Sequence, residues 1–407
     1  MNKLQKIDII SIIIIAGFSL AVFYHYVLGT YLGLSYPYNT FLFRPNDKFM
    51  DFYNMLLSPY VNGQLHLVQF PFGQRLAQSF SILPDNVNFV VFMAIYLSFF
   101  LYVNYSNLST SIKEQTIKNV FVFSFLTYPF LILFDRANIG EVFVFIFLYL
   151  FIFFYRKQKT IISIIFLSFA ISMKLFPAVF LVLLLSDKKY KEAIYTVLLV
   201  MIISICGYLS YDGNLIENIR SHLAGLNYYS MVYSIGNEGL YFGNSLWGLV
   251  KLIVIGIGLH CPAALASKVY SISVLILFAL VALYIVFREK NFWKKVALLV
   301  FSMNLFPFVS GDYKLIHIFI PLFLFINSED TNKFDFLYAI LFGLLIIPKA
   351  CFHYEANPEI TSSIIINPLL MAFFMILIMS DGLSTGLKQM RSGSRVRQEN
   401  LEENRAN

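Results

Sequence analysis

The sequence predicts an all-α, polytopic membrane protein, and composition is the first reason. The chain has 407 residues, of which 58% are hydrophobic and 18% aromatic, while only 13% are charged. Soluble domains carry about 25% charged residues, so these side chains are too few to cover a water-facing surface. The net charge of +7 comes from short basic clusters between apolar runs, which indicates membrane topology. This composition excludes a soluble enzyme, a disordered protein, a disulfide scaffold and a nucleic-acid binder.

The spacing of the apolar runs is the second reason. A membrane span needs about 20 mostly apolar residues, or fewer where protein shelters the helix. The first run has no small-residue cleavage site after it, so we expect it to be retained. We expect about 12 transmembrane helices, at 8–28, 86–106, 119–134, 141–155, 160–173, 175–187, 192–210, 269–287, 294–309, 314–327, 335–349 and 362–380. The stretch 244–266 is interrupted by Gly256, Gly258 and Pro262, and we expect a re-entrant or interfacial segment there.

Basic residues predict how these runs cross the membrane, because cytoplasmic loops are enriched in Lys and Arg. The clusters are Lys3/Lys6, Lys113/Lys118, 156–159, 188–191, 288–295 and 388–397. They all fall on one side if 160–187 crosses twice and 244–266 does not cross. Both termini and a polar tail, 381–407, are then cytoplasmic. The single polytopic domain, 1–380, has extracytoplasmic loops at 29–85 and 211–243, which we expect to carry short helices.

Charged side chains near the apolar runs gather on the predicted outer face. Asp47 and Asp51 are four residues apart in the first outer loop, so they would share one face of a helix. In an outward cleft, one of them could take a proton from an acceptor hydroxyl as a general base. The plainer alternative is that both carboxylates cap a helix or face solvent.

Cations at the outer ends of three runs form a second candidate set. Arg136, Lys174 and Lys314 could hold an anionic headgroup such as a phosphate. The alternative is pairing with a neighbour, Asp135 for Arg136 and Asp312 for Lys314. Lys174 has no acidic neighbour in the sequence, which leaves substrate contact and a structural partner equally open.

Other residue types give weaker signals. The histidines His66, His222, His317 and His353 lie in separate loops without ligand spacing, so hydrogen bonding is a simpler role than metal binding. We expect no metal site and no cofactor, although a divalent-metal requirement stays open. The tyrosines Tyr228, Tyr229, Tyr233 and Tyr241 could stack on sugar rings or anchor the membrane interface. The chain has no Gly-rich nucleotide cradle, which argues against a nucleotide-sugar donor.

Five short motifs occur in a characteristic order. They are FMDFYN (49–54), DRANIGE (135–141), SMKLFP (172–177), NSLWGL (244–249) and PFVSGDYKLIHIFIPL (307–322). From about Asp47 to Pro321 the chain therefore resembles the GT-C glycosyltransferases, and among them glycosyltransferase family 87. This resemblance implies a GT-C-like fold and a donor sugar linked through a phosphodiester to a polyprenyl chain at the outer leaflet. It also implies typically inverting transfer, with mannose as the common sugar.

The resemblance also assigns roles to individual residues. It implies that Asp51 is the general base, with Asp47 as second choice. It implies donor contacts from three sets of residues: Asp135, Arg136 and Asn138; Lys174; and Asp312, Tyr313 and Lys314. Ala137 stands where the family pattern has Gly, and Lys314 stands where it has Arg, which keeps the charge but loses bidentate geometry.

We therefore expect a glycosyltransferase of a bacterial inner membrane. A lipid phosphate is a good leaving group that needs cations to stabilise it, whereas an acceptor hydroxyl needs a base. The acceptor would be a glycan or a lipid, and membrane lipids would surround the protein. One alternative, a polysaccharide polymerase, would concentrate arginines in its outer loops, which hold only Arg44, Arg75 and Arg220. Another, a lipid-linked sugar flippase or small-solute transporter, would place polar groups near the bilayer midplane.

Overall fold

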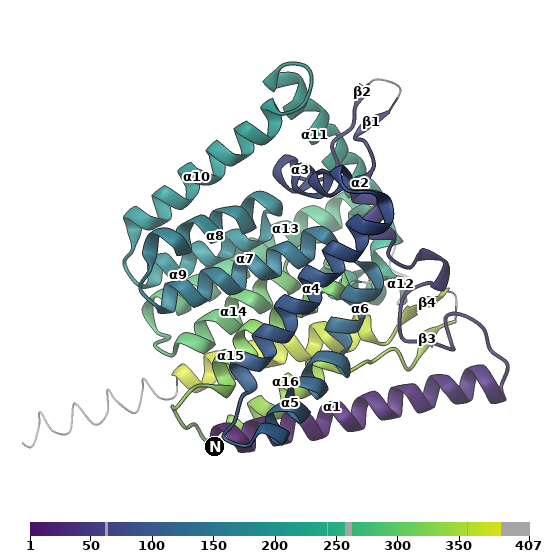
Figure 1. Cartoon of the computed structure of the whole chain (residues 1–407), viewed down its shortest axis with the longest axis vertical. Helices are drawn as coiled ribbons and strands as arrows, with labels where there is room; N and C mark the ends of the chain where they lie inside the picture. Colours follow the sequence, from purple (N-terminus) through teal and green to yellow (C-terminus); the bar gives the residue numbers. More distant parts are fainter. Residues whose placement is uncertain (62–63, 242, 257–262, 356, 384–407) are drawn as a thin grey trace, which may run out of the picture.

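The computed structural model describes residues 1–61, 64–241, 243–256, 263–355 and 357–383, and it is almost wholly helical (Figure 1). The longer helices are α1 (Lys3–Tyr26), α4 (Asp85–Leu108), α5 (Lys113–Phe125), α6 (Tyr128–Arg136), α7 (Ile139–Arg156), α8 (Thr160–Met173), α10 (Tyr190–Leu209), α12 (Leu246–Gly256), α13 (Ala263–Phe287), α14 (Phe292–Leu305), α16 (Asp335–Ile346) and Ser363–Leu383. Shorter helices are α9 (Leu181–Ser186) and α15 (Phe319–Ile326). The predicted all-α membrane architecture is confirmed.

The lengths and composition of the described helices do not confirm twelve membrane spans. Among the described residues, six helices are long and apolar enough to cross a membrane: Lys3–Tyr31, Asn86–Leu108, Ile139–Arg156, Tyr190–Leu209, Leu265–Phe287 and Ser363–Leu383. A seventh crossing is formed if α5 and α6, which meet at 53°, count as one broken span. The other expected spans are short; a 14-residue helix such as α8 is about 21 Å long, against about 30 Å of hydrocarbon. The count of twelve is therefore not confirmed.

Burial explains how such short apolar helices are accommodated. Every residue of α14 from Trp293 to Leu305 is buried, and so are seven of the eight residues of α15. Helices in this position are surrounded by protein, so their ends need not reach the edges of the hydrocarbon layer. By contrast, α10 and α13 leave most of their apolar side chains exposed, as expected of helices in contact with lipid.

The basic clusters of several loops meet at one end of the helix bundle. The Nζ atom of Lys294 lies 2.5 Å from Asp381, and that of Lys295 lies 3.1 Å from Asp187. The N-terminal amine lies 3.1 Å from Asp335. We call this the basic end. Figure 1 shows the N-terminus and the end of helix Ser363–Leu383 on this side, and α2, α12 and β3–β4 on the opposite side, the loop end.

The expected outer loops carry short helices, as predicted, and also two small hairpins. The first loop contains α2 (Met50–Leu56), α3 (Pro71–Ser79), β1 (Tyr60–Val61) and β2 (Gln64–Leu65), and 3₁₀ or π turns at Val27–Tyr31, Pro45–Asp47 and Phe80–Ile82. The second contains α11 (Leu215–Tyr229), Ser230–Ile235 and Glu238–Leu240. The second hairpin pairs β3 (His353–Tyr354) with β4 (Asn357–Thr361), and 3₁₀ turns occupy Phe176–Phe180 and Asp312–Ile318.

Two sequence predictions fall partly outside the described residues. The expected re-entrant segment 244–266 includes 257–262, so only its first part, α12, and the start of α13 are described. The expected polar tail, 381–407, lies outside them from residue 384 onward. Its first three residues belong to the last helix, which ends at Leu383.

Candidate active site

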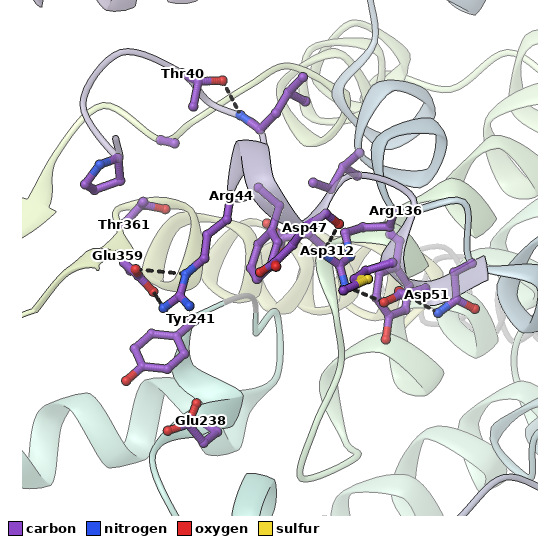
Figure 2. A pocket seen from close by; sticks show the side chains of 18 of the residues that line it. Thr40, Arg44, Asp47, Asp51, Arg136, Glu238, Tyr241, Asp312, Glu359 and Thr361 are labelled. Carbon is purple, nitrogen blue, oxygen red and sulfur yellow. Dashed lines mark hydrogen bonds and ion pairs between the residues drawn. The ribbon is translucent and has the colours of Figure 1, made fainter. Parts of the chain in front are cut away.

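A cavity of about 520 Å³ lies at the loop end. Its walls come from segments far apart in the sequence: the first outer loop, the α6–α7 junction, the end of α11, the 3₁₀ turn Asp312–Ile318 and strand β4. Figure 2 shows two ion pairs on opposite sides of this cavity, Arg136–Asp51 and Arg44–Glu359, with Asp47 and Asp312 between them.

Asp51 is held by two donors from the α6–α7 junction. The Nη2 atom of Arg136 donates to one of its carboxylate oxygens, and Nδ2 of Asn138 donates to the other over 2.9 Å. Arg136 also donates to the backbone carbonyl of Asp47 over 3.1 Å, and its guanidinium lies 4.4 Å from the centre of the Phe43 ring. The Asp51 side chain remains 17% exposed, so it is restrained but reachable from the cavity.

The expectation that Asp47 and Asp51 share one helix face is wrong. Asp47 ends a 3₁₀ turn, and Phe49 has a left-handed backbone (φ +61°) that separates this turn from α2. The Phe49 amide donates to the carbonyl of Asp135 over 2.8 Å, which ties the start of α2 to the end of α6. Tertiary contact therefore overrides the helical spacing, although both carboxylates still line the cavity.

The α6–α7 junction is a tight turn that presents Arg136 and Asn138 to the same carboxylate. Ala137 ends α6 in the left-handed region (φ +50°), where L side chains cost about 1–2 kcal/mol and Gly costs little. Asn138 then caps α7, because its Oδ1 accepts from the Glu141 amide over 2.9 Å. Ala137 thus adopts the geometry for which the family pattern has Gly.

Lys174 and Lys314 do not line the cavity but lie behind its Tyr313 wall. Lys174 donates to Glu141 over 2.5 Å, and the other oxygen of Glu141 lies 2.7 Å from Nε2 of His317. Lys314 lies 4.1 Å from the centre of the Phe176 ring and 3.5 Å from a backbone carbonyl. The acidic partner of Lys174 is therefore Glu141, 33 residues away in sequence.

Asp312 is buried and serves as a hydrogen-bond acceptor. Tyr128 donates to one of its oxygens and Nδ2 of Asn244 to the other, the latter over 2.5 Å. Burial raises the pKa of the Asp312 carboxyl to about 6. Neither alternative neighbour pairing forms, since Arg136 pairs with Asp51 and Asp312 accepts from Tyr128 and Asn244.

Polar and aromatic side chains line the far side of the cavity. Arg44 and Glu359 form a forked ion pair there, with Nε and Oε1 3.0 Å apart, and Figure 2 shows Tyr241 and Glu238 beside it. Of the tyrosines considered for sugar stacking, the cavity wall contains Tyr229, Tyr233 and Tyr241. The Tyr229 and Tyr233 rings lie with their centres 4.6 Å apart.

The structure thus brings together six of the eight predicted site residues: Asp47, Asp51, Arg136, Asn138, Asp312 and Tyr313. Sequence reasoning missed Glu141 as the partner of Lys174 and His317, and it missed the Arg44–Glu359 pair. Glu141 did carry a signal, because a carboxylate in the first turn of an apolar helix is costly unless it is partnered. In the part of the chain that the structure describes, no three His, Cys, Asp or Glu side chains are grouped to hold a metal ion.

Comparison with known proteins adds one match. A family model described as glycosyltransferase family 87 matches residues 71–311, more than half of the chain. The matched segment contains the α6–α7 junction and Lys174; Asp47 and Asp51 precede it, and Asp312 follows it directly. Comparisons with curated proteins and with solved structures give no match.

Proposed function

The chain belongs to glycosyltransferase family 87 and is a membrane glycosyltransferase, and we propose that its donor is a sugar linked through a phosphodiester to a polyprenyl chain. The proposed acceptor is a hydroxyl of a glycan or lipid, and Asp51 is the general base. The observation that carries this proposal is the position of Asp51, held by Arg136 and Asn138 on the wall of the cavity at the loop end.

The proposed reaction uses the two members of this ion pair in different ways. The acceptor oxygen attacks the anomeric carbon, the bond from that carbon to the phosphate oxygen breaks, and polyprenyl phosphate leaves with the bonding electrons. The acceptor proton passes to Asp51. Arg136 can share its fork between the carboxylate and the donor phosphate, so that donor binding loosens the hold on Asp51. Asp47, whose carboxyl also lines the cavity, is the second choice of base.

The cations behind the wall have a supporting role in this proposal. Lys174 is neutralised by Glu141, whereas Lys314 adds a second positive charge to the same buried group. Lys314 makes the electrostatic potential at Tyr313 more positive, which would stabilise a departing phosphate without touching it. Asp312 fixes the turn that carries Tyr313, through its bonds to Tyr128 and Asn244.

The setting that we propose is the extracytoplasmic face of a bacterial inner membrane, with both termini cytoplasmic. The grouping of the basic clusters at the end opposite the cavity supports this orientation. Mannose is the first sugar to test, and the reaction as written requires neither metal nor cofactor.

The test is a donor comparison with purified protein in lipid nanodiscs. Labelled polyprenyl-phosphate mannose and labelled nucleotide sugars are each supplied with an extract of membrane lipids and glycans. We expect transfer from the lipid-linked donor alone, unchanged by a chelator. Transfer from a nucleotide sugar, or failure of the protein to bind any lipid-linked sugar, would contradict the proposal.

A further inference from the structure

A second cavity, of about 350 Å³, lies near the basic end, away from the candidate active site. Three elements enclose it: the end of α4, the last two turns of α7, and helix α15. Asn327, just after α15, donates to the carbonyl of Asn107 over 3.2 Å and so joins two of these elements. Its lining residues are Asn107, Tyr149, Ile152, Phe153, Arg156, Lys157, Ile320, Phe323 and Leu324.

The lining divides into an apolar wall and a polar rim. Ile152, Ile320 and Phe323 are buried at 2–4% exposure, so the wall is held in place by the packing of α7 and α15. The rim includes Asn107 and Tyr149, joined by a hydrogen bond of 2.9 Å from Nδ2 to the phenol oxygen. An apolar wall below a polar rim matches an amphiphile better than a soluble metabolite.

The charge at the rim is positive and is not neutralised locally. Arg156 and Lys157 are both exposed, and Lys157 lies 4.1 Å from the centre of the Phe153 ring. Within the described residues, the Arg156 side chain has neither an ion pair nor a hydrogen bond, and the sequence has no Asp or Glu between Glu141 and Asp187. The other basic cluster nearby differs, since Lys294 and Lys295 pair with Asp381 and Asp187.

We propose that this cavity binds an anionic phospholipid from the leaflet at the basic end. The phosphate contacts Arg156 and Lys157, and the upper part of an acyl chain lies against Ile320, Phe323 and Leu324. Basic pockets between transmembrane helices are suited to acidic lipid headgroups. Because no carboxylate lines the cavity to receive an ammonium group, the site favours phosphatidylglycerol over a zwitterionic lipid.

Binding is measured without reference to transfer activity, so this proposal and the proposed function can fail separately. Delipidated protein in a neutral detergent is titrated with short-chain phosphatidylglycerol, phosphatidylcholine and glycerol 3-phosphate. Native mass spectrometry counts bound molecules, and thermal unfolding reports stabilisation. We expect phosphatidylglycerol to bind at least tenfold more tightly than either of the other two.

Two variants and one matched control locate the site. The double change Arg156→Gln/Lys157→Gln removes the rim charge, and Leu324→Trp fills the cavity while keeping both cations. Each should weaken phosphatidylglycerol binding at least tenfold. The control, Arg288→Gln/Lys290→Gln, removes two exposed cations from another loop and should leave phosphatidylglycerol binding unchanged. Equal loss in both double variants, no preference over phosphatidylcholine, or equally tight binding of glycerol 3-phosphate would each overturn the proposal.

Discussion

At the scale of single residues, the site depends on how Asp51 is restrained. One tight turn supplies both of its donors, a charged one from Arg136 and a neutral one from Asn138. A carboxylate held on both oxygens has a fixed orientation toward the cavity, and fixed orientation is a large part of what a catalytic group contributes. The charged donor is also the group best suited to bind a phosphate. In the proposed mechanism, the base and the donor site are therefore coupled through the Arg136 side chain.

The Asp312 carboxyl makes the stability of the fold depend on pH. Its pKa is about 6 when folded, against about 3.9 for an unperturbed aspartate, so the folded state binds the proton more tightly. This contribution to the free energy of unfolding is fully present below about pH 4 and is lost as the pH rises through 6. We expect roughly 2–3 kcal/mol to be lost across that window.

Thermal unfolding in detergent at a series of pH values measures this effect. Asp312→Asn removes the titrating group and should flatten the profile between pH 4 and 6, while Asp212→Asn, a change in an exposed loop, should keep the wild-type slope. A wild-type slope in Asp312→Asn would mean that another group is responsible.

At the scale of elements, α7 links the cavity wall to the buried cations. Asn138 caps the helix and contacts Asp51, and one turn later Glu141 pairs with Lys174 and His317. A displacement of the start of α7 would therefore disturb both groups. The helix is the most buried of the six candidate spans, which makes it a stiff support.

Removing the Glu141 charge should destabilise the protein strongly. Glu141→Gln leaves the Lys174 ammonium without its carboxylate, and breaking a buried pair in this way costs about 3–5 kcal/mol. Glu141→Gln combined with Lys174→Met removes both charges and should recover most of that loss. Melting temperatures of wild type, Glu141→Gln and the double variant measure the loss of stability and its recovery. A double variant less stable than Glu141→Gln would show that the broken ion pair is not the source of that loss.

The sequence predicted the elements better than their contacts. Apolar runs located most helices of the bundle, because burial and lipid both select for them, but not α2, α3 or α11 in the loops. Spacing failed at Asp47 and Asp51, since the left-handed Phe49 and its bond to Asp135 interrupt the helix. The partner of Lys174 was missed because Glu141 is on a different helix, and Arg44–Glu359 because 315 residues separate them. Such pairings depend on tertiary packing, which periodicity does not encode.

At the scale of the whole molecule, the cavity and the basic clusters lie at opposite ends of the bundle. The cavity and its charged residues occupy the loop end, whereas the basic clusters and both ends of the described chain occupy the other. Charge patterning predicted this grouping, because the cost of moving Lys and Arg across a membrane sorts them to one side. It did not predict which helices are too short to cross the hydrocarbon layer alone, because their shelter by protein depends on tertiary packing.

Cysteine labelling tests the proposed orientation. In a cysteine-free background, Ser58→Cys places an exposed thiol at the loop end, and Ser111→Cys places one in the α4–α5 turn near the basic end. A membrane-impermeant maleimide added to intact cells should label Ser58→Cys alone, with Ser111→Cys labelled only after lysis. The opposite pattern would put the cavity on the cytoplasmic side and exclude a donor from the outer leaflet.

The most direct test of the central claim compares Asp51→Asn with wild type, using the lipid-linked donor that supports transfer. Asparagine keeps the size of the side chain but cannot accept the proton, so we expect the rate of transfer to fall about 10²- to 10⁴-fold. Donor binding should persist, because Arg136 is then free for the phosphate, and Asp212→Asn should behave as wild type. Transfer by Asp51→Asn at the wild-type rate, with the protein folded and inserted, would contradict the account.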